Sequence, residues 1–116
     1  MTIDRWQGSA KGRNRAVRHD GLVYTVATAP GANITAQTRA ALAAIDKNLA
    51  DAGSDKTCLL SVQIFLADMS QKTEMDEVWN DWIGPDWRIW PQRACVGAAL
   101  AGDVMVEIVV KAALKE

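Results

Sequence analysis

The segment from Asn33 to Gly53 constrains the fold more than any other part of this sequence, because it predicts one long amphipathic helix. Its apolar residues recur at steps of three and four, which places them on one face of a helix. Asn33 is a favourable N-cap residue, and Gly53 suits the left-handed position that follows a helix C-terminus. The apolar stripe consists of Ala41, Leu42, Ile45, Leu49 and Ala52.

Extended segments flank this helix on both sides. Residues 15–30 contain two short runs around Asp20 and Gly21, a dipeptide that permits positive φ and is typical of a hairpin turn. Residues 57–68 alternate in the manner of a central strand that a helix covers on one side. One face of that strand carries Leu60, Val62, Ile64 and Leu66, and the other carries Leu59, Ser61, Gln63 and Phe65.

A second helix and two further strands complete the predicted fold. The helix runs over about 71–83 and ends at Gly84. Residues 93–99 and 103–114 follow as two strands joined by a short turn, which predicts an antiparallel hairpin. The order of elements predicts an α+β protein, in which a sheet and two helices form a sandwich.

Length and composition favour one domain over residues 1–116. At this size a chain buries roughly two-thirds of its surface on folding, which is enough for a core that needs no disulfide bonds or metal ions to stabilise it. No apolar run reaches the eighteen or so residues that span a bilayer, and the N-terminus has no apolar signal core. The cysteines Cys58 and Cys95 lack metal-ligand spacing with the single histidine, His19. We therefore expect a soluble, cytoplasmic protein with no membrane association, no metal and no other cofactor.

Positive charge is concentrated near the N-terminus, although the net charge of the chain is −1. Aromatic residues are not interleaved with this cluster beyond Trp6, and no nucleic-acid motif is present. We interpret the cluster as solvated, paired or lining a pocket rim, and do not expect nucleic acid as a partner. Its members are Arg5, Lys11, Arg13, Arg15 and Arg18.

The sheet face that the helices leave uncovered is too apolar to contact water. In the last strand, Val104, Val106, Ile108 and Val110 alternate with Met105, Glu107 and Val109. An exposed apolar face of this kind marks an assembly surface. The sequence therefore predicts an oligomer, which Val106→Asp or Val109→Asp should dissociate.

Arg93 and Glu107 are charged residues within apolar strands, where an unpaired buried charge costs several kcal/mol. The predicted hairpin places Cys95 opposite Glu107, and Arg93 lies one diagonal step away, at roughly 7–8 Å. One interpretation is a structural ion pair at an interface. The other is a small site, in which the guanidinium binds a planar carboxylate and Glu107 holds or deprotonates a water. Such a site suits a 2-keto, 2-imino or 2-amino acid.

The segment WPQRACVGAALAGDVMVEIVV, residues 90–110, resembles the C-terminal signature of the RidA/YjgF family of reactive-intermediate imine deaminases, also described as endoribonuclease L-PSP-like. In that family an arginine, a cysteine two residues later and a glutamate in a closing V-E-I strand recur. The resemblance extends over most of the chain, from about Ala16 to Leu114. It is most specific in this C-terminal segment.

The resemblance implies a fold, an assembly and an activity. The implied fold is the chorismate-mutase-like two-layer sandwich of the bacillus type, a mixed sheet packed on two helices. The implied assembly is a homotrimer whose sheets form a central barrel, with sites between subunits. The implied activity is cofactor-free hydrolysis of 2-imino or 2-enamino acids, such as 2-iminopropionate or 2-aminoacrylate, to 2-keto acids and ammonia. Arg93 would bind the substrate carboxylate, Glu107 would position the water, and Cys95 would line the pocket.

Some positions depart from that family and leave a second function open. Val26 and Ala27 occupy the places of a serine and a glycine that many members have, and Asn14 or Arg15 stands near the place of a pocket tyrosine. Trp90, in the loop before the predicted site, is a candidate pocket residue that would select larger or more apolar imines. The alternative function is a non-catalytic protein of the same fold that binds small carboxylates or has a regulatory role. An RNA-cleaving activity would depend on the basic N-terminal segment alone.

Overall fold

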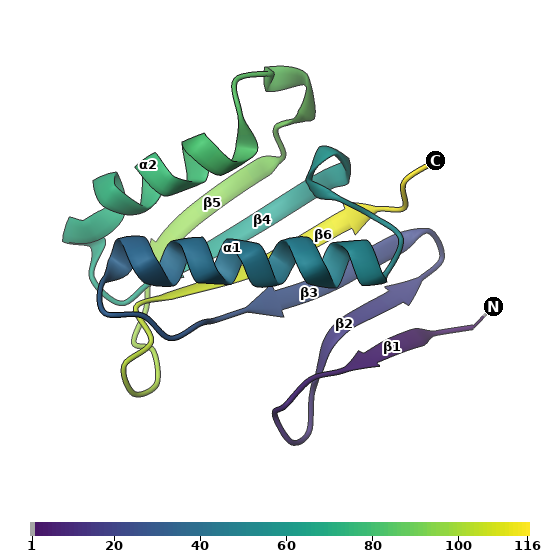
Figure 1. The fold of residues 1–116 in the computed structure, drawn as a ribbon, viewed down its shortest axis with the longest axis horizontal. Helices are drawn as coiled ribbons and strands as arrows, with labels where there is room; N and C mark the ends of the chain where they lie inside the picture. The colour runs from purple at the N-terminus through teal and green to yellow at the C-terminus, as the bar shows by residue number, and fades with distance from the viewer. Residues whose placement is uncertain (1) are drawn as a thin grey trace.

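The computed structural model describes residues 2–116 and shows a six-stranded sheet with two helices packed on one face (Figure 1). The strand order is β1-β2-β3-β6-β4-β5, and every neighbouring pair is antiparallel except β4 and β5. This mixed sheet on two helices confirms the predicted sandwich. The strands are β1 (Asp4–Gln7), β2 (Asn14–His19), β3 (Leu22–Ala27), β4 (Leu59–Leu66), β5 (Gln92–Gly97) and β6 (Val106–Ala113). The helices are α1 (Ile34–Asp51) and α2 (Lys72–Ile83), with short 3-10 turns at Lys56–Cys58, Met69–Gln71 and Trp87–Ile89.

The long helix α1 forms as the sequence predicts. Asn33 Oδ1 accepts a hydrogen bond from the backbone N–H of Ala36 at 2.9 Å, and Gly53 follows the helix with a φ of 88°. Every residue of the predicted apolar stripe is at most 1% exposed. The stripe belongs to one core with the helix-facing side chains of the sheet, among them Val23, Val62, Ile64 and Ile108.

The predicted hairpin is formed by β2 and β3. His19 pairs with Leu22, and Asp20 and Gly21 take φ values of 53° and 79° in the turn between them. The edge strand β1, which pairs with β2, was not predicted. Its residues alternate only between half-buried and exposed, so no apolar run distinguishes it from a loop.

The central strand β4 lies where the sequence predicts it, with one irregularity. Val62, Ile64 and Leu66 face the helices and are at most 2% exposed. The register with β6 shifts between Leu59 and Ser61, which reverses the predicted sides at the start of the strand. Leu59 is therefore buried, at 6% exposed, and Leu60 is 48% exposed.

The predicted antiparallel pairing of the last two strands is wrong. β5 pairs in parallel with one edge of β4, and β6 pairs with the other edge, so β4 separates them. Cys95 lies opposite Ile64, and Glu107 lies opposite Phe65. Because β6 already has β3 on one edge and β4 on the other, it has no edge left for β5. The helix α2 makes the crossover that two parallel strands require.

Candidate active site

Arg93 lies on the helix-facing side of β5, opposite Val62, where its side chain reaches α2. Its Nη2 donates a hydrogen bond to Asp76 Oδ1 at 2.7 Å, and its guanidinium carbon lies 5.3 Å from the centroid of the Trp79 ring. The side chain is 20% exposed. Within one chain its charge partner is Asp76, and not Glu107 as the ion-pair interpretation supposed. Spacing along the sequence gave no signal for this contact, because it joins a helix to a strand.

Asp76 is shared by two cations. Lys72 precedes it by one turn of α2, and its Nζ lies 2.6 Å from Asp76 Oδ2. Burial acts to raise the pKa of Asp76, but hydrogen bonds from Lys72 and Arg93 outweigh burial and hold that pKa below its ordinary value. The carboxylate is therefore ionised at neutral pH. We call Lys72, Asp76 and Arg93 the Arg93 cluster, which carries two positive charges and one negative charge.

Cys95 lies two residues after Arg93, on the same side of β5, and is half-buried beside the core. Burial raises the pKa of its thiol, and the positive charges of Arg93 and Lys72 oppose this shift without cancelling it. A protonated thiol is a poor nucleophile. Its role as a pocket wall stays a prediction.

Trp90 lies beside Arg93, as its place in the sequence suggests. Its Nε1 donates a hydrogen bond to the carbonyl of Gly84 at 2.9 Å, which fixes the indole across the loop, and the residue is 52% exposed. A cavity of about 180 Å³ next to it is lined by Trp79, Asn80, Ile83, Trp90, Pro91 and Arg93. Trp87, in the same loop, is 71% exposed and is not among these residues.

Glu107 lies on the other face of the sheet, the one that the helices leave open. Its neighbour in the register, Phe65, alternates with the helix-facing residues of β4. A cavity of about 450 Å³ on this side is lined by Arg13, Val26, Ala27, Thr28, Leu100, Ala101, Val104 and Glu107. The structure thus brings Val26 and Ala27 together with Glu107. It also adds Arg13, which the sequence marks only as one member of the basic N-terminal cluster.

One chain therefore holds the candidate site in two halves. The Arg93 cluster and Cys95 face α2, whereas Glu107 and its cavity face the open side of the sheet. The prediction that Arg93, Cys95 and Glu107 share one hairpin face is wrong for the single chain, because β4 runs between the two strands that carry them.

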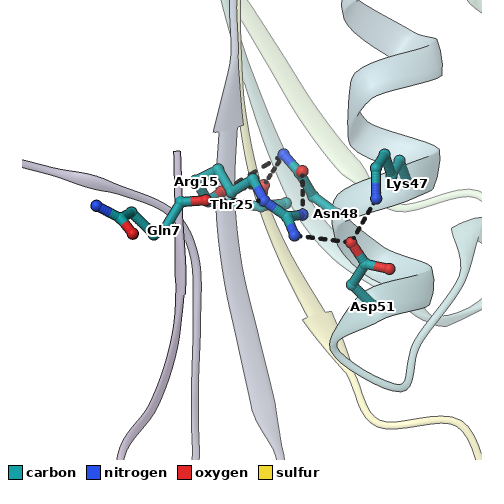
Figure 2. Close-up of polar contacts among 6 residues, drawn as sticks. All are labelled: Gln7, Arg15, Thr25, Lys47, Asn48 and Asp51. Atoms are coloured by element: carbon teal, nitrogen blue, oxygen red, sulfur yellow. Dashed lines mark hydrogen bonds and ion pairs between the residues drawn. The ribbon is translucent and has the colours of Figure 1, made fainter. Parts of the chain in front are cut away.

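A polar network joins β2 and β3 to α1, as Figure 2 shows. Arg15 donates from Nη1 to Asn48 Oδ1 at 2.9 Å, and its Nη2 lies 2.8 Å from Asp51 Oδ2. Asn48 in turn donates to Thr25 Oγ1 at 2.9 Å, and Lys47 contacts the same oxygen of Asp51 at 2.8 Å. This member of the basic cluster is therefore paired, and it holds the N-terminal hairpin against the helix.

Neither a metal cluster nor a membrane-spanning helix is found in the part of the chain that the structure describes. Within residues 2–116, no three His, Cys, Asp or Glu side chains are grouped so that they could hold a metal ion. Over the same residues, neither helix is both long enough and apolar enough to span a bilayer.

The family model for endoribonuclease L-PSP matches residues 8–114 of the chain. The chain belongs to this family. It is 38% identical over 115 residues to a RutC family protein of Haemophilus influenzae, with 95% of this chain and 97% of that protein covered. It is 34% identical to the RutC family protein YoaB of Escherichia coli, with 98% and 100% covered.

A solved structure agrees with this membership of the endoribonuclease L-PSP family. NMB1025 of Neisseria meningitidis, a member of the YjgF protein family, superposes with a TM-score of 0.91 at 35% sequence identity. The superposition covers 100% of this chain and 98% of that one. The predicted resemblance to the YjgF family is therefore confirmed, while the names of these relatives specify no reaction.

Proposed function

We propose that this member of the endoribonuclease L-PSP family hydrolyses reactive 2-imino and 2-enamino acids to 2-keto acids and ammonia. The observation that carries the proposal is the environment of Arg93, a guanidinium held in a half-buried position by Asp76 and Trp79. A fixed, partly desolvated guanidinium is suited to binding a planar carboxylate. Family membership and the position of Glu107 in a cavity support the same reaction.

The roles follow from the chemistry of C=N hydrolysis. Arg93 would bind the carboxylate of the substrate and so fix the adjacent C=N carbon. Glu107 would accept a proton from a water molecule while the water oxygen forms a bond to that carbon. In the resulting carbinolamine, protonated Glu107 would return this proton to the nitrogen, the C–N bond would break to release ammonia, and Glu107 would take up the hydroxyl proton as C=O forms. No electron is transferred, so the balance of the reaction requires no oxidant or reductant.

The proposal requires a second subunit, because β4 separates Arg93 from Glu107 within one chain. We infer a homotrimer in which β5 of one subunit approaches the Glu107 cavity of the next. β5 is an edge strand with Val96 43% exposed, and Val26 and Val109 are partly exposed on the open face. Burial of these side chains would stabilise the assembly by about 25 cal/mol per Å² of apolar area. Contact with the next subunit would also cover the exposed edge of β5.

The test is an imine-trapping assay. An amino-acid oxidase or a dehydratase generates the imine, semicarbazide traps it, and an active deaminase lowers the yield of semicarbazone. Arg93→Ala should reduce the activity at least 100-fold, because about 3 kcal/mol of charge-assisted hydrogen bonding is lost. Arg88→Ala is the matched control, since that side chain is 74% exposed and its ion pair is with Asp86, in the same loop.

The outcome separates the two interpretations of Arg93. Retention of the assembly with loss of activity agrees with carboxylate binding, whereas dissociation of the Arg93→Ala protein agrees with a structural ion pair. If the wild-type protein accelerates the hydrolysis of no imine, from alanine-like to basic and aromatic ones, the proposed activity is wrong.

A second candidate function is non-catalytic binding of small carboxylates in the same site. It is favoured by Val26, which lines the Glu107 cavity without a hydroxyl group to contact a substrate or water. Thermal unfolding with a panel of 2-keto and 2-amino acids tests it, because a ligand that binds the folded state raises the midpoint. Stabilisation without turnover of any imine would favour this candidate.

The basic N-terminal segment adds little support for a nucleic-acid substrate. Arg18 pairs with Asp4 at 3.0 Å and Arg15 pairs with Asp51 at 2.8 Å, so these two charges are partly neutralised within the chain. We therefore propose small imino acids instead of RNA as substrates.

A further inference from the structure

The Arg93 cluster places an anion directly beside the group proposed to bind the substrate carboxylate. Asp76 Oδ1 lies 2.7 Å from Arg93 Nη2, and the two side chains are 25% and 20% exposed. Neither charged side chain is fully buried, and Arg93 also lines the cavity of about 180 Å³ beside Trp90. A protonated 2-imino acid carries a matching pair of charges, a cationic nitrogen and an anionic carboxylate. The two charges are close together because the C=N carbon is bonded directly to the carboxylate carbon.

The geometry points to Asp76 as a specificity-determining residue that accepts a hydrogen bond from the protonated nitrogen of a 2-imino acid while Arg93 binds the carboxylate. This inference rests on the proposed function, since it takes Arg93 as the carboxylate-binding residue. It names the substrate class more closely: acids with a cationic N–H group next to the carboxylate.

The hydrogen-bonding capacity of the pair allows such a ligand. A guanidinium has five N–H donors, and in residues 2–116 only Nη2 of Arg93 donates a hydrogen bond to another residue. Each oxygen of Asp76 accepts one hydrogen bond, Oδ1 from Arg93 and Oδ2 from Lys72, and a carboxylate oxygen has about two lone-pair sites. A carboxylate can therefore bind Arg93, and an N–H group can bind Asp76, without breaking the ion pair.

The charge state of Asp76 distinguishes substrate from product. Hydrogen bonds from Lys72 and Arg93 outweigh burial and keep the pKa of Asp76 low, so at neutral pH the carboxylate only accepts hydrogen bonds. Hydrolysis replaces the N–H donor of the substrate by a carbonyl oxygen, which is an acceptor. The contact with Asp76 then changes from attractive to repulsive, and the 2-keto acid is released.

Binding of two stable ligands tests this inference without an activity assay. Alanine has a cationic nitrogen next to its carboxylate, and pyruvate has a carbonyl oxygen in the same place. We expect the wild-type protein to bind alanine more tightly than pyruvate by calorimetry or ligand-observed NMR. Asp76→Asn should lower this preference about 10-fold or more, because a hydrogen bond to a charged group is lost while the amide oxygen can still accept from Arg93. Glu77→Gln, which neutralises an exposed carboxylate next along α2, should leave the preference unchanged.

Each possible result supports or contradicts the role proposed for Asp76. An unchanged preference in Asp76→Asn, or an equal loss of both ligands, would show that Asp76 only holds Arg93 in place. Wild-type protein that prefers pyruvate, or binds neither ligand, would also overturn the inference. If Asp76→Asn does not fold, the comparison of alanine with lactate and pyruvate on the wild-type protein still tests it. An imine assay that is negative while the alanine preference depends on Asp76 would reject the proposed reaction alone.

Discussion

Several charged side chains in this chain form ion pairs with side chains that are distant in sequence. Arg93 pairs with Asp76, Arg15 with Asp51, and Lys115 with Asp55, at 2.7, 2.8 and 2.7 Å. Each pair offsets part of the cost of removing charges from water. Arg93 is tolerated within an apolar strand for this reason, and its guanidinium keeps a defined orientation before any ligand binds.

Asp55 should make stability depend on pH in the acid range. Its hydrogen bonds, first from Lys115 and then from Thr57, lower its pKa from 3.8 to about 2. Because the pKa is lower in the folded state than in the unfolded state, the carboxylate stabilises the fold above pH 3.8, and this contribution is lost as pH falls towards 2. Asp55→Asn should therefore lower the free energy of unfolding at neutral pH, by less than about 1 kcal/mol because the pair is partly exposed.

Denaturant titrations across pH test this prediction. The difference between wild type and Asp55→Asn should shrink as the pH approaches 2. Asp81→Asn, an exposed position on α2, is the control and should show no such convergence. A difference for Asp55→Asn that is constant with pH would contradict the assignment.

At the scale of elements, polar side chains decide how α1 meets the N-terminal hairpin. The apolar stripe of α1 predicts burial, but it does not specify which strands the ends of the helix contact. Asn48, at 5% exposed, connects Arg15 on β2 with Thr25 on β3. This contact ties the C-terminal part of the helix to both strands of the hairpin.

Asn48→Ala should lower the free energy of unfolding by about 1–3 kcal/mol, because Arg15 Nη1 and Thr25 Oγ1 both lose a hydrogen-bond partner in a partly buried place. Chemical denaturation measures the change. Lys47→Ala is the matched control one residue earlier, where a side chain that is 70% exposed contacts Asp51. It should change stability by less than about 0.5 kcal/mol. Equal losses in the two variants would show that the network contributes nothing specific.

At the scale of the whole molecule, the sheet has one face covered by helices and one face open. Val106 is 0% exposed beneath the helices, whereas Val109 is partly exposed on the open side. The expectation that a charge at either valine would dissociate an oligomer therefore needs correction. Val106→Asp would place an unpaired carboxylate in the core and unfold the protein.

Val109→Asp should convert the proposed homotrimer into folded monomers, because it places a charge on the apolar face that the subunits would bury. Sedimentation measures the mass, and circular dichroism checks that the fold remains. Imine hydrolysis should be lost with the assembly, since Arg93 and Glu107 would then remain in separate halves. A wild-type monomer with full activity would contradict both the assembly and the shared site.

Elements whose signals lie within a few residues could be predicted from the sequence. Caps and a periodic stripe predict α1, a left-handed dipeptide predicts the hairpin turn, and alternation predicts β4, because each depends on local backbone preferences or on the period of one element. The family could also be recognised from the sequence, because Arg93, Cys95 and Glu107 stand in the order and spacing of its C-terminal signature. Arg93 and Trp90 were correctly placed close together.

Which groups meet across the sheet could not be predicted from the sequence and became clear only from the complete fold. Spacing predicted that β5 would pair with β6, but β3 and β4 occupy both edges of β6, and β5 pairs with the outer edge of β4 instead. This arrangement moved Glu107 away from Arg93, gave Arg93 its partner Asp76, and brought Arg13 to the Glu107 cavity. Strand pairing depends on which edges remain free after the whole sheet has assembled, and that is a property of the complete fold instead of any one segment.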